Sequence, residues 1–140
     1  MREIKFRGKK ISNGKWVRGY LTRVGHDYAF IEYDNEDGRH NHLVYANTVG
    51  QYTGLKDEDG VEIFEGDIVE VHETPFNLSA IGVVIYCPET ARFLIREQNK
   101  KYPHVFSFQK HDTYNDGYCT VECESDFHVI GNIHDNPELL

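Results

Sequence analysis

The chain has 140 residues, 39% of them hydrophobic, and a formal net charge of −8 with its eight histidines neutral. That length suits one domain, and the apolar content excludes a chain that is disordered throughout. No apolar run is long enough to span a membrane, and the start MREIKFRGKK lacks the apolar segment of a signal peptide. Three cysteines are too few for a secreted disulfide scaffold, so we expect a cytoplasmic protein. Together with the length and the lack of a long apolar run, this predicts a single domain over residues 1–140 without a membrane partner.

Two strand-like runs, residues 2–11 and 15–23, open the chain and flank Ser12-Asn13-Gly14. Asn-Gly between two such runs predicts a hairpin with a two-residue type I′ turn, because both central residues of that turn need a positive φ. With Asn13-Gly14 as the turn, the predicted register pairs Ser12 with Lys15, Ile11 with Trp16, Lys9 with Arg18, Arg7 with Tyr20 and Phe6 with Leu21.

The two faces of this predicted hairpin differ in chemistry, since directly opposed residues share a face of the sheet. The first is a core face of small and apolar residues, namely Ile4, Phe6, Gly8, Val17, Gly19 and Leu21. The second face carries the candidate binding residues, namely Lys5, Arg7, Lys9, Trp16, Arg18 and Tyr20. Cations interleaved with aromatic rings bind single-stranded nucleic acid through phosphate contacts and base stacking.

The charge of the chain is divided unevenly along its length. Residues 1–25 hold eight basic residues and one acid, a net +7, whereas residues 26–140 hold seven basic residues and 22 acids, a net −15. The basic face therefore has two open interpretations. Either it contacts nucleic acid, or its cations are used within the protein, where they stack on the chain's own Trp16 and Tyr20 or meet an acidic surface of a neighbouring element or subunit. The overall −8 argues against a broad clamp on duplex DNA, whose affinity comes mainly from Lys and Arg.

The rest of the chain alternates between short apolar runs and polar turns. The predicted strands are residues 27–33, 39–46, 51–55, 61–64, 68–72, 81–86, 92–97, 105–109, 118–124 and 127–133. Many short strands at a spacing of roughly 8–12 residues favour an all-β barrel or sandwich, with helix expected at most as a short turn at residues 136–140. Residues 73–79, which contain Thr74-Pro75, are a candidate boundary between subdomains.

Nothing in the sequence predicts a metal site, a cofactor or a catalytic centre. Asp57-Glu58-Asp59-Gly60 has its glycine fourth rather than sixth, which is wrong for a calcium loop and suits a tight turn. Cys119 and Cys123 are interpreted as buried thiols of a core strand, and His40 and His42 as exposed polar residues of another. The sequence also lacks the motifs of nucleophile elbows, phosphate-binding loops, zinc proteases and dinucleotide folds, so we do not expect an enzyme.

Three blocks of sequence point to a family. They are REIKFRG at residues 2–8, VGQYTGLKD at 49–57 followed by IFEGDIV at 63–69, and VIGNI at 129–133 followed by NPELL at 136–140. In these blocks the chain resembles the YopX family of phage and prophage proteins. The resemblance implies a mostly β fold with a small SH3-like barrel and additional hairpins, in a cytoplasmic protein made during phage infection or from a prophage. It implies no activity and no catalytic residues.

We therefore expect an all-β phage or prophage protein that binds or assembles without catalysing a reaction. A homo-oligomer is the expected state, in which the basic residues 1–25 meet an acidic surface, and a host or phage protein is a candidate partner. Two alternatives stay open. One is a single-stranded nucleic-acid-binding module that uses the N-terminal hairpin, and the other is an acidic decoy that imitates DNA towards a host protein.

Overall fold

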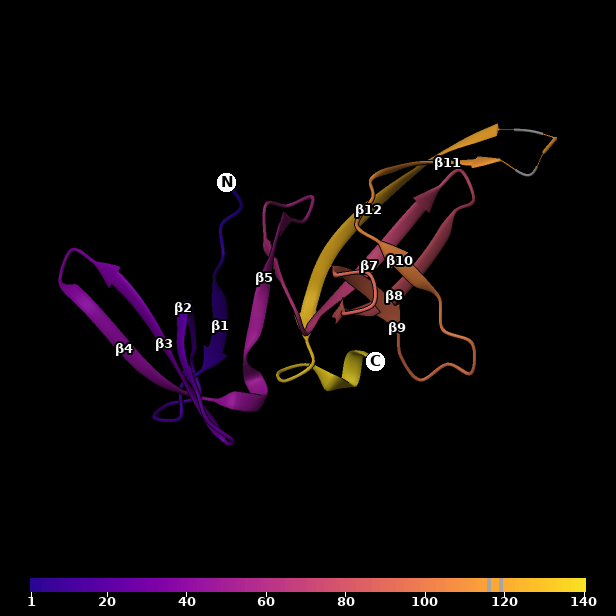
Figure 1. The fold of residues 1–140 in the computed structure, drawn as a ribbon. Helices are drawn as coiled ribbons and strands as arrows, with labels where there is room; N and C mark the ends of the chain where they lie inside the picture. Colours follow the sequence, from indigo (N-terminus) through magenta and orange to yellow (C-terminus); the bar gives the residue numbers. More distant parts are fainter. Residues whose placement is uncertain (116, 119) are drawn as a thin grey trace. The chain divides into compact units, whose positions relative to one another are not determined.

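The structure is a computed structural model that describes residues 1–115, 117–118 and 120–140 (Figure 1). Asp116 and Cys119 lie outside the described residues, as do the side chains of residues 111, 112, 114 and 121–123. The interpretation of Cys119 and Cys123 as core thiols therefore stays a prediction. The described chain divides into two compact units, Met1–Leu55 and Lys56–Leu140, and each is described by itself. The expectation of a single domain over residues 1–140 also stays a prediction.

Short strands account for most of the chain, and the prediction of an all-β protein is confirmed. In chain order the elements are β1 (Phe6–Lys9), β2 (Trp16–Val24), β3 (Tyr28–Asn35), β4 (Gly38–Tyr45), the 3-10 helix η1 (Ala46–Thr48), β5 (Gly50–Lys56), β6 (Glu62–Phe64), β7 (Asp67–Thr74), β8 (Leu78–Cys87), β9 (Arg92–Glu97), β10 (Val105–Ser107), β11 (His111–Asn115), β12 (Thr120–Asn132) and the 3-10 helix η2 (Pro137–Leu139). Neither helix in the described part of the chain is long or apolar enough to cross a membrane. The candidate boundary at residues 73–79 joins β7 to β8, which pair as a hairpin.

The strands form two open antiparallel sheets, in the orders β4-β3-β2-β1-β5-β6 and β10-β9-β8-β7-β12-β11. The expected closure into a small SH3-like barrel is therefore wrong. In the first sheet β1 pairs with β2 on one side and with β5 on the other, so β4 cannot pair along it and close the sheet. A bridge between Lys10 and Val44, with a hydrogen bond from Ile11 N–H to the Leu43 carbonyl (3.0 Å), joins the end of β1 to β4 without closing it.

The first hairpin has a longer turn than the sequence predicts. The pairs between β1 and β2 are Phe6–Gly19, Arg7–Arg18, Gly8–Val17 and Lys9–Trp16, so the predicted register is wrong by two positions. The turn holds residues 11–14, because Lys10 N–H donates to the Lys15 carbonyl (2.9 Å) and Gly14 N–H donates to the Lys10 carbonyl (2.8 Å). Gly14 takes the positive φ of +70° that this turn needs. Since a shift of two residues is even, both predicted faces of the hairpin are kept.

The core of the first unit lies on the predicted apolar face. Its buried residues are Val17, Ala29, Ile31 and Val44, and Phe6, Leu21, Tyr33 and Val49 pack against them. Gly19 is required where β2 passes β3, since a Cβ there would lie 2.2 Å from the Glu32 carbonyl oxygen. Ile4 departs from the prediction: it precedes β1 and is 54% exposed.

The core of the second unit is formed by Ile63, Val69, Val71, Val84, Ile95 and Phe127. In the same unit Asp57 is buried and accepts three backbone hydrogen bonds. Its Oδ1 accepts from Asp59 N–H (2.9 Å) and Val61 N–H (2.8 Å), and its Oδ2 accepts from Val129 N–H of β12 (3.0 Å). Although desolvation by burial raises the pKa of Asp57, these hydrogen bonds hold it below its ordinary value. This carboxylate therefore shapes the turn after β5 and ties that turn to β12.

Candidate nucleic-acid interface

All six candidate binding residues belong to the first unit, and the register places them on one face of its sheet. The pairs Arg7–Arg18 and Lys9–Trp16 lie directly opposite each other, and alternation along β2 adds Tyr20. Lys5 directly precedes β1, and its carbonyl accepts a hydrogen bond from Tyr52 N–H of β5 (2.9 Å), which continues the pairing of β1 with β5. The structure thus brings the predicted set together. That these residues bind a ligand stays a prediction.

Three of the cations contact aromatic rings of the chain itself. The Arg7 guanidinium lies 4.7 Å from the centre of the Trp16 ring, and the Lys9 ammonium lies 5.6 Å from the same centre. The Lys5 ammonium lies 4.7 Å from the centre of the Tyr52 ring. Arg7 is also deeply buried, with 7% of its surface exposed. Part of the basic set therefore stacks on the chain's own rings, which is one of the two interpretations of the sequence.

The exposed part of this face continues from β2 onto β3. Arg18 and Tyr20 are both exposed, Tyr20 by 64%. Tyr20 lies opposite Glu32, and further along the same two strands Arg23 lies opposite Phe30. The Arg23 guanidinium is 5.7 Å from the centre of the Phe30 ring. Cations and an aromatic ring therefore alternate along β2 as Arg18, Tyr20 and Arg23, and β3 adds the Phe30 ring and the Glu32 carboxylate beside them.

Two exposed tyrosines extend the face onto β4. Tyr28 of β3 lies opposite Tyr45 of β4, and the Tyr28 ring meets the Phe30 ring edge-on with their centres 6.1 Å apart. We define the basic-aromatic face as Lys5, Arg7, Lys9, Trp16, Arg18, Tyr20, Arg23, Tyr28, Phe30 and Tyr45.

Sequence reasoning missed the last four members of this face. A β-bulge between Leu21 and Arg23 turns Arg23 onto the face of Tyr20, whereas strict alternation along the strand puts it on the core face. The alternation in DYAFIEY at residues 27–33 does carry a signal for Tyr28 and Phe30. The sequence does not say, however, that this strand lies beside residues 15–23.

Net charge follows the division into units. Met1–Leu55 holds nine basic and six acidic residues, a net +3, whereas Lys56–Leu140 holds six basic and 17 acidic residues, a net −11. The basic-aromatic face therefore belongs to a unit of net positive charge, and that charge favours contact with a polyanion.

The sequence predicts that His40 and His42 are exposed. In the structure both residues are instead half-buried, on the core face of β4. They lie opposite Tyr33 and Ile31, and the rings of His40 and His42 both stack with the ring of Tyr33, at centre distances of 5.0 and 5.5 Å. Burial, followed by the charges of Lys10 and His40, lowers the pKa of His42. These rings serve packing, and among the described residues no group of three or more His, Cys, Asp or Glu is placed to hold a metal ion.

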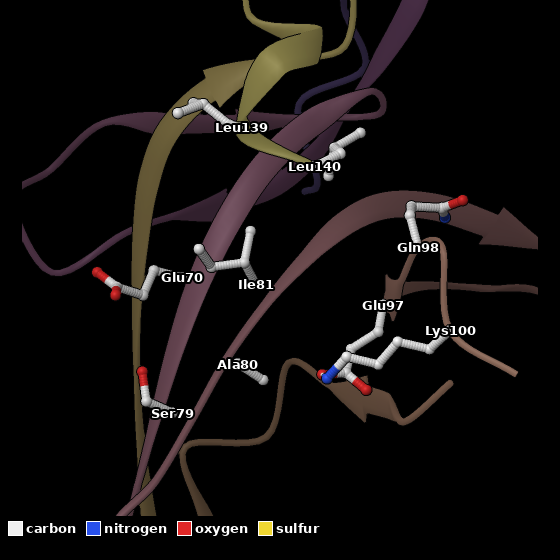
Figure 2. Close-up of a pocket in the computed structure, with 9 residues that line it drawn as sticks. All are labelled: Glu70, Ser79, Ala80, Ile81, Glu97, Gln98, Lys100, Leu139 and Leu140. Atoms are coloured by element: carbon white, nitrogen blue, oxygen red, sulfur yellow. The ribbon is translucent and has the colours of Figure 1, made fainter. Parts of the chain in front are cut away.

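A separate hollow of about 350 Å³ lies in the second unit (Figure 2), lined by Glu70, Ser79, Ala80, Ile81, Glu97, Gln98, Lys100, Leu139 and Leu140. The buried Glu97 carboxylate accepts a hydrogen bond from His104 N–H (3.0 Å), lies 2.8 Å from His104 Nδ1 and pairs with Lys100. The Lys100 ammonium and then the His104 N–H lower the pKa of Glu97 to about 2. This carboxylate stays ionised and fastens the loop after β9, so it is not poised for proton transfer near neutral pH.

Comparisons with known proteins cover nearly the whole chain. Residues 5–140 match the family model described as YopX protein. The fold is similar to the crystal structure of protein EF1440 from Enterococcus faecalis, with 25% sequence identity and a TM-score of 0.54, over 100% of this chain and 99% of that chain. No curated protein matches the chain.

Proposed function

The chain belongs to the YopX family, and we propose that it is a non-enzymatic binding protein whose ligand is single-stranded nucleic acid. The observation that carries the proposal is the basic-aromatic face, where cations and exposed rings share one side of an open sheet in a unit of net charge +3. Bases that are not paired offer their flat faces for stacking, and a sheet surface can hold several of them in a row.

The parts of the face have separate tasks in this proposal. The exposed rings of Tyr20 and Tyr28 are platforms for bases, and such stacking is worth about 1–3 kcal/mol per base. The exposed Arg18 and Arg23 neutralise phosphates. Arg7 is buried and supports the Trp16 ring, so it positions an aromatic residue instead of contacting the strand.

Fluorescence anisotropy with a labelled single strand of about 20 nucleotides, and with its duplex, tests the proposal. We expect tighter binding to the single strand, with the logarithm of the affinity falling linearly with the logarithm of the salt concentration. Tyr20→Ala should weaken binding about tenfold through lost stacking. Arg18→Glu should weaken binding to every sequence and reduce the salt slope by about one or more.

A matched control is Arg92→Glu, which makes the same charge change at an exposed residue of β9 in the acidic unit. It should bind as the unaltered protein does. The proposal fails if no single strand binds at low salt, or if Arg92→Glu and Arg18→Glu lose the same affinity.

The opposite net charges of the two units, +3 and −11, support a second candidate function, which is assembly. In this proposal the basic-aromatic face of one copy meets the acidic unit of another copy to form a homo-oligomer, or the acidic unit meets a basic host or phage protein as a decoy would. Sedimentation at low and high salt separates assembly from strand binding, because an electrostatic oligomer has a mass that falls as salt rises.

The setting of the function is likewise a proposal. Action in the cytoplasm of a bacterium, during phage infection or from a prophage, is supported by the resemblance in the three sequence blocks. The small number of cysteines agrees with a reducing compartment.

A further inference from the structure

A hollow of about 260 Å³ opens on the basic-aromatic face, and its lining comes from β2, β3 and β4 of the first unit: Thr22, Arg23, Phe30, Glu32 and Asn41. It lies at the β-bulge between Leu21 and Arg23, a feature that commonly redirects side chains at sites of function. The hollow is smaller than the ~300–1,000 Å³ of pockets for drug-sized ligands, so its size suits a single base.

The lining combines one ring with groups that form hydrogen bonds. Phe30 is half-buried, and the Arg23 guanidinium lies over its ring, 5.7 Å from the ring centre. Glu32 is also half-buried, and it pairs with Tyr20 on one neighbouring strand and with Asn41 on the other.

The Glu32 carboxylate can accept further hydrogen bonds in addition to its ion pair with Arg39. Arg39 Nε lies 3.0 Å from Glu32 Oε1. A carboxylate offers about four lone-pair positions on two oxygens, so this contact leaves positions for a ligand. A negative charge on a basic face repels the phosphates of a bound strand. It lowers affinity for nucleic acid in general unless a base donates hydrogen bonds to it.

We propose that this hollow receives one guanine base of the bound single strand, an inference that rests on the proposed function. Guanine carries two adjacent donors on its Watson–Crick edge, N1–H and the N2 amino group, and these match the two oxygens of the Glu32 carboxylate. Adenine and cytosine each place a ring acceptor beside one amino donor, and thymine and uracil place a single donor between two carbonyls. In the bound state Phe30 contacts the flat face of the guanine, and Tyr20 stacks on the neighbouring base.

The test is anisotropy with oligothymidine strands that carry one central guanine, adenine or inosine, and with the matching RNA strands. Inosine lacks only the N2 amino group of guanine, so it removes one of the two hydrogen bonds. We expect the guanine strand to bind about tenfold more tightly than plain oligothymidine, with the inosine strand between them. Glu32→Gln should abolish this preference while it retains or slightly raises the affinity for oligothymidine.

Glu36→Gln is the matched control, since it removes the same charge from an exposed residue of the β3–β4 turn, and it should keep the guanine preference. Asn41→Ala is a second variant, at an exposed position of the lining that pairs with Glu32. It removes a side-chain amide that can donate to the O6 acceptor of guanine, so it should reduce the preference even if Glu32→Gln does not fold. Equal affinity for guanine and thymine strands, or a preference that survives Glu32→Gln, overturns the guanine site and leaves strand binding intact. Failure to bind any strand overturns the proposed function itself.

Discussion

Replacement of Asp57 is expected to destabilise the second unit far more than loss of one surface charge would. The side chain is 6% exposed, and its two oxygens accept hydrogen bonds from three backbone N–H groups. A hydrogen bond to a charged group contributes about 1.5–3 kcal/mol. Asp57→Asn keeps one carbonyl oxygen for the two donors of the turn, but it turns an amide N–H₂ towards the Val129 N–H. We therefore expect a loss of about 2–3 kcal/mol, a large share of the ~5–15 kcal/mol that stabilises a typical domain.

Urea denaturation at pH 7, followed by far-ultraviolet circular dichroism, measures this loss. Glu138→Gln is the control, because it removes the same charge from an exposed residue of the same unit. The pKa of Asp57 is lowered by folding, so its contribution is fully present above the unfolded pKa of about 3.9 and is lost as pH falls through the folded value. The difference between the Asn variant and the unaltered protein should therefore shrink below about pH 4. A difference under about 0.5 kcal/mol at pH 7, or one that does not change with pH, refutes the reasoning.

Three further outcomes are expected. Gly19→Ala should lower the melting temperature of the first unit by more than about 10 °C in a thermal scan, because the added Cβ would collide with the Glu32 carbonyl. An unchanged melting temperature would show that β2 and β3 can move apart with little loss of stability. His128 Nδ1 lies 3.2 Å from the Asp59 carboxylate, which raises the pKa of the histidine. His128→Gln should therefore lower the free energy of unfolding below about pH 6.5 and leave it unchanged once pH exceeds the pKa of His128 in the folded protein. A loss of stability that is the same at every pH would contradict this. Glu97→Gln should speed tryptic cleavage of the loop after β9 several-fold, and an unchanged cleavage rate would mean that this carboxylate does not hold the loop.

Alternation along the strands predicted the two faces of the first hairpin correctly, while the turn chemistry predicted its register wrongly. Asn13-Gly14 fits a two-residue turn, but Lys10 and Lys15 close a turn of residues 11–14 instead. The error did not disturb the faces because it is an even number of residues. The prediction of a barrel was wrong because the sheet stays open where β5, and not β4, pairs with the second edge of β1. No local pattern in the sequence indicates that pairing.

The candidate site was predictable only within one hairpin. The six residues of that hairpin are brought together by a contact that is local in sequence. Arg23 depends on a bulge that no alternation pattern indicates, and Tyr45 on the pairing of β4 with β3. The core position of His40 and His42 was missed because two histidines spaced by one residue equally suit an exposed strand face.

The pairing of β12 with β7 sets an order for the folding of the chain during its synthesis. Val69 pairs with Val129, 60 residues later, and Phe127 belongs to the core of the second unit. The ribosome must therefore release the chain to beyond Val129 before this core can close. The buried cluster of the first unit, Val17, Ala29, Ile31 and Val44, lies within the first 55 residues, so it can form while the second unit is still being made. A newly made chain thus presents its basic, aromatic part to the cell before its acidic part has folded.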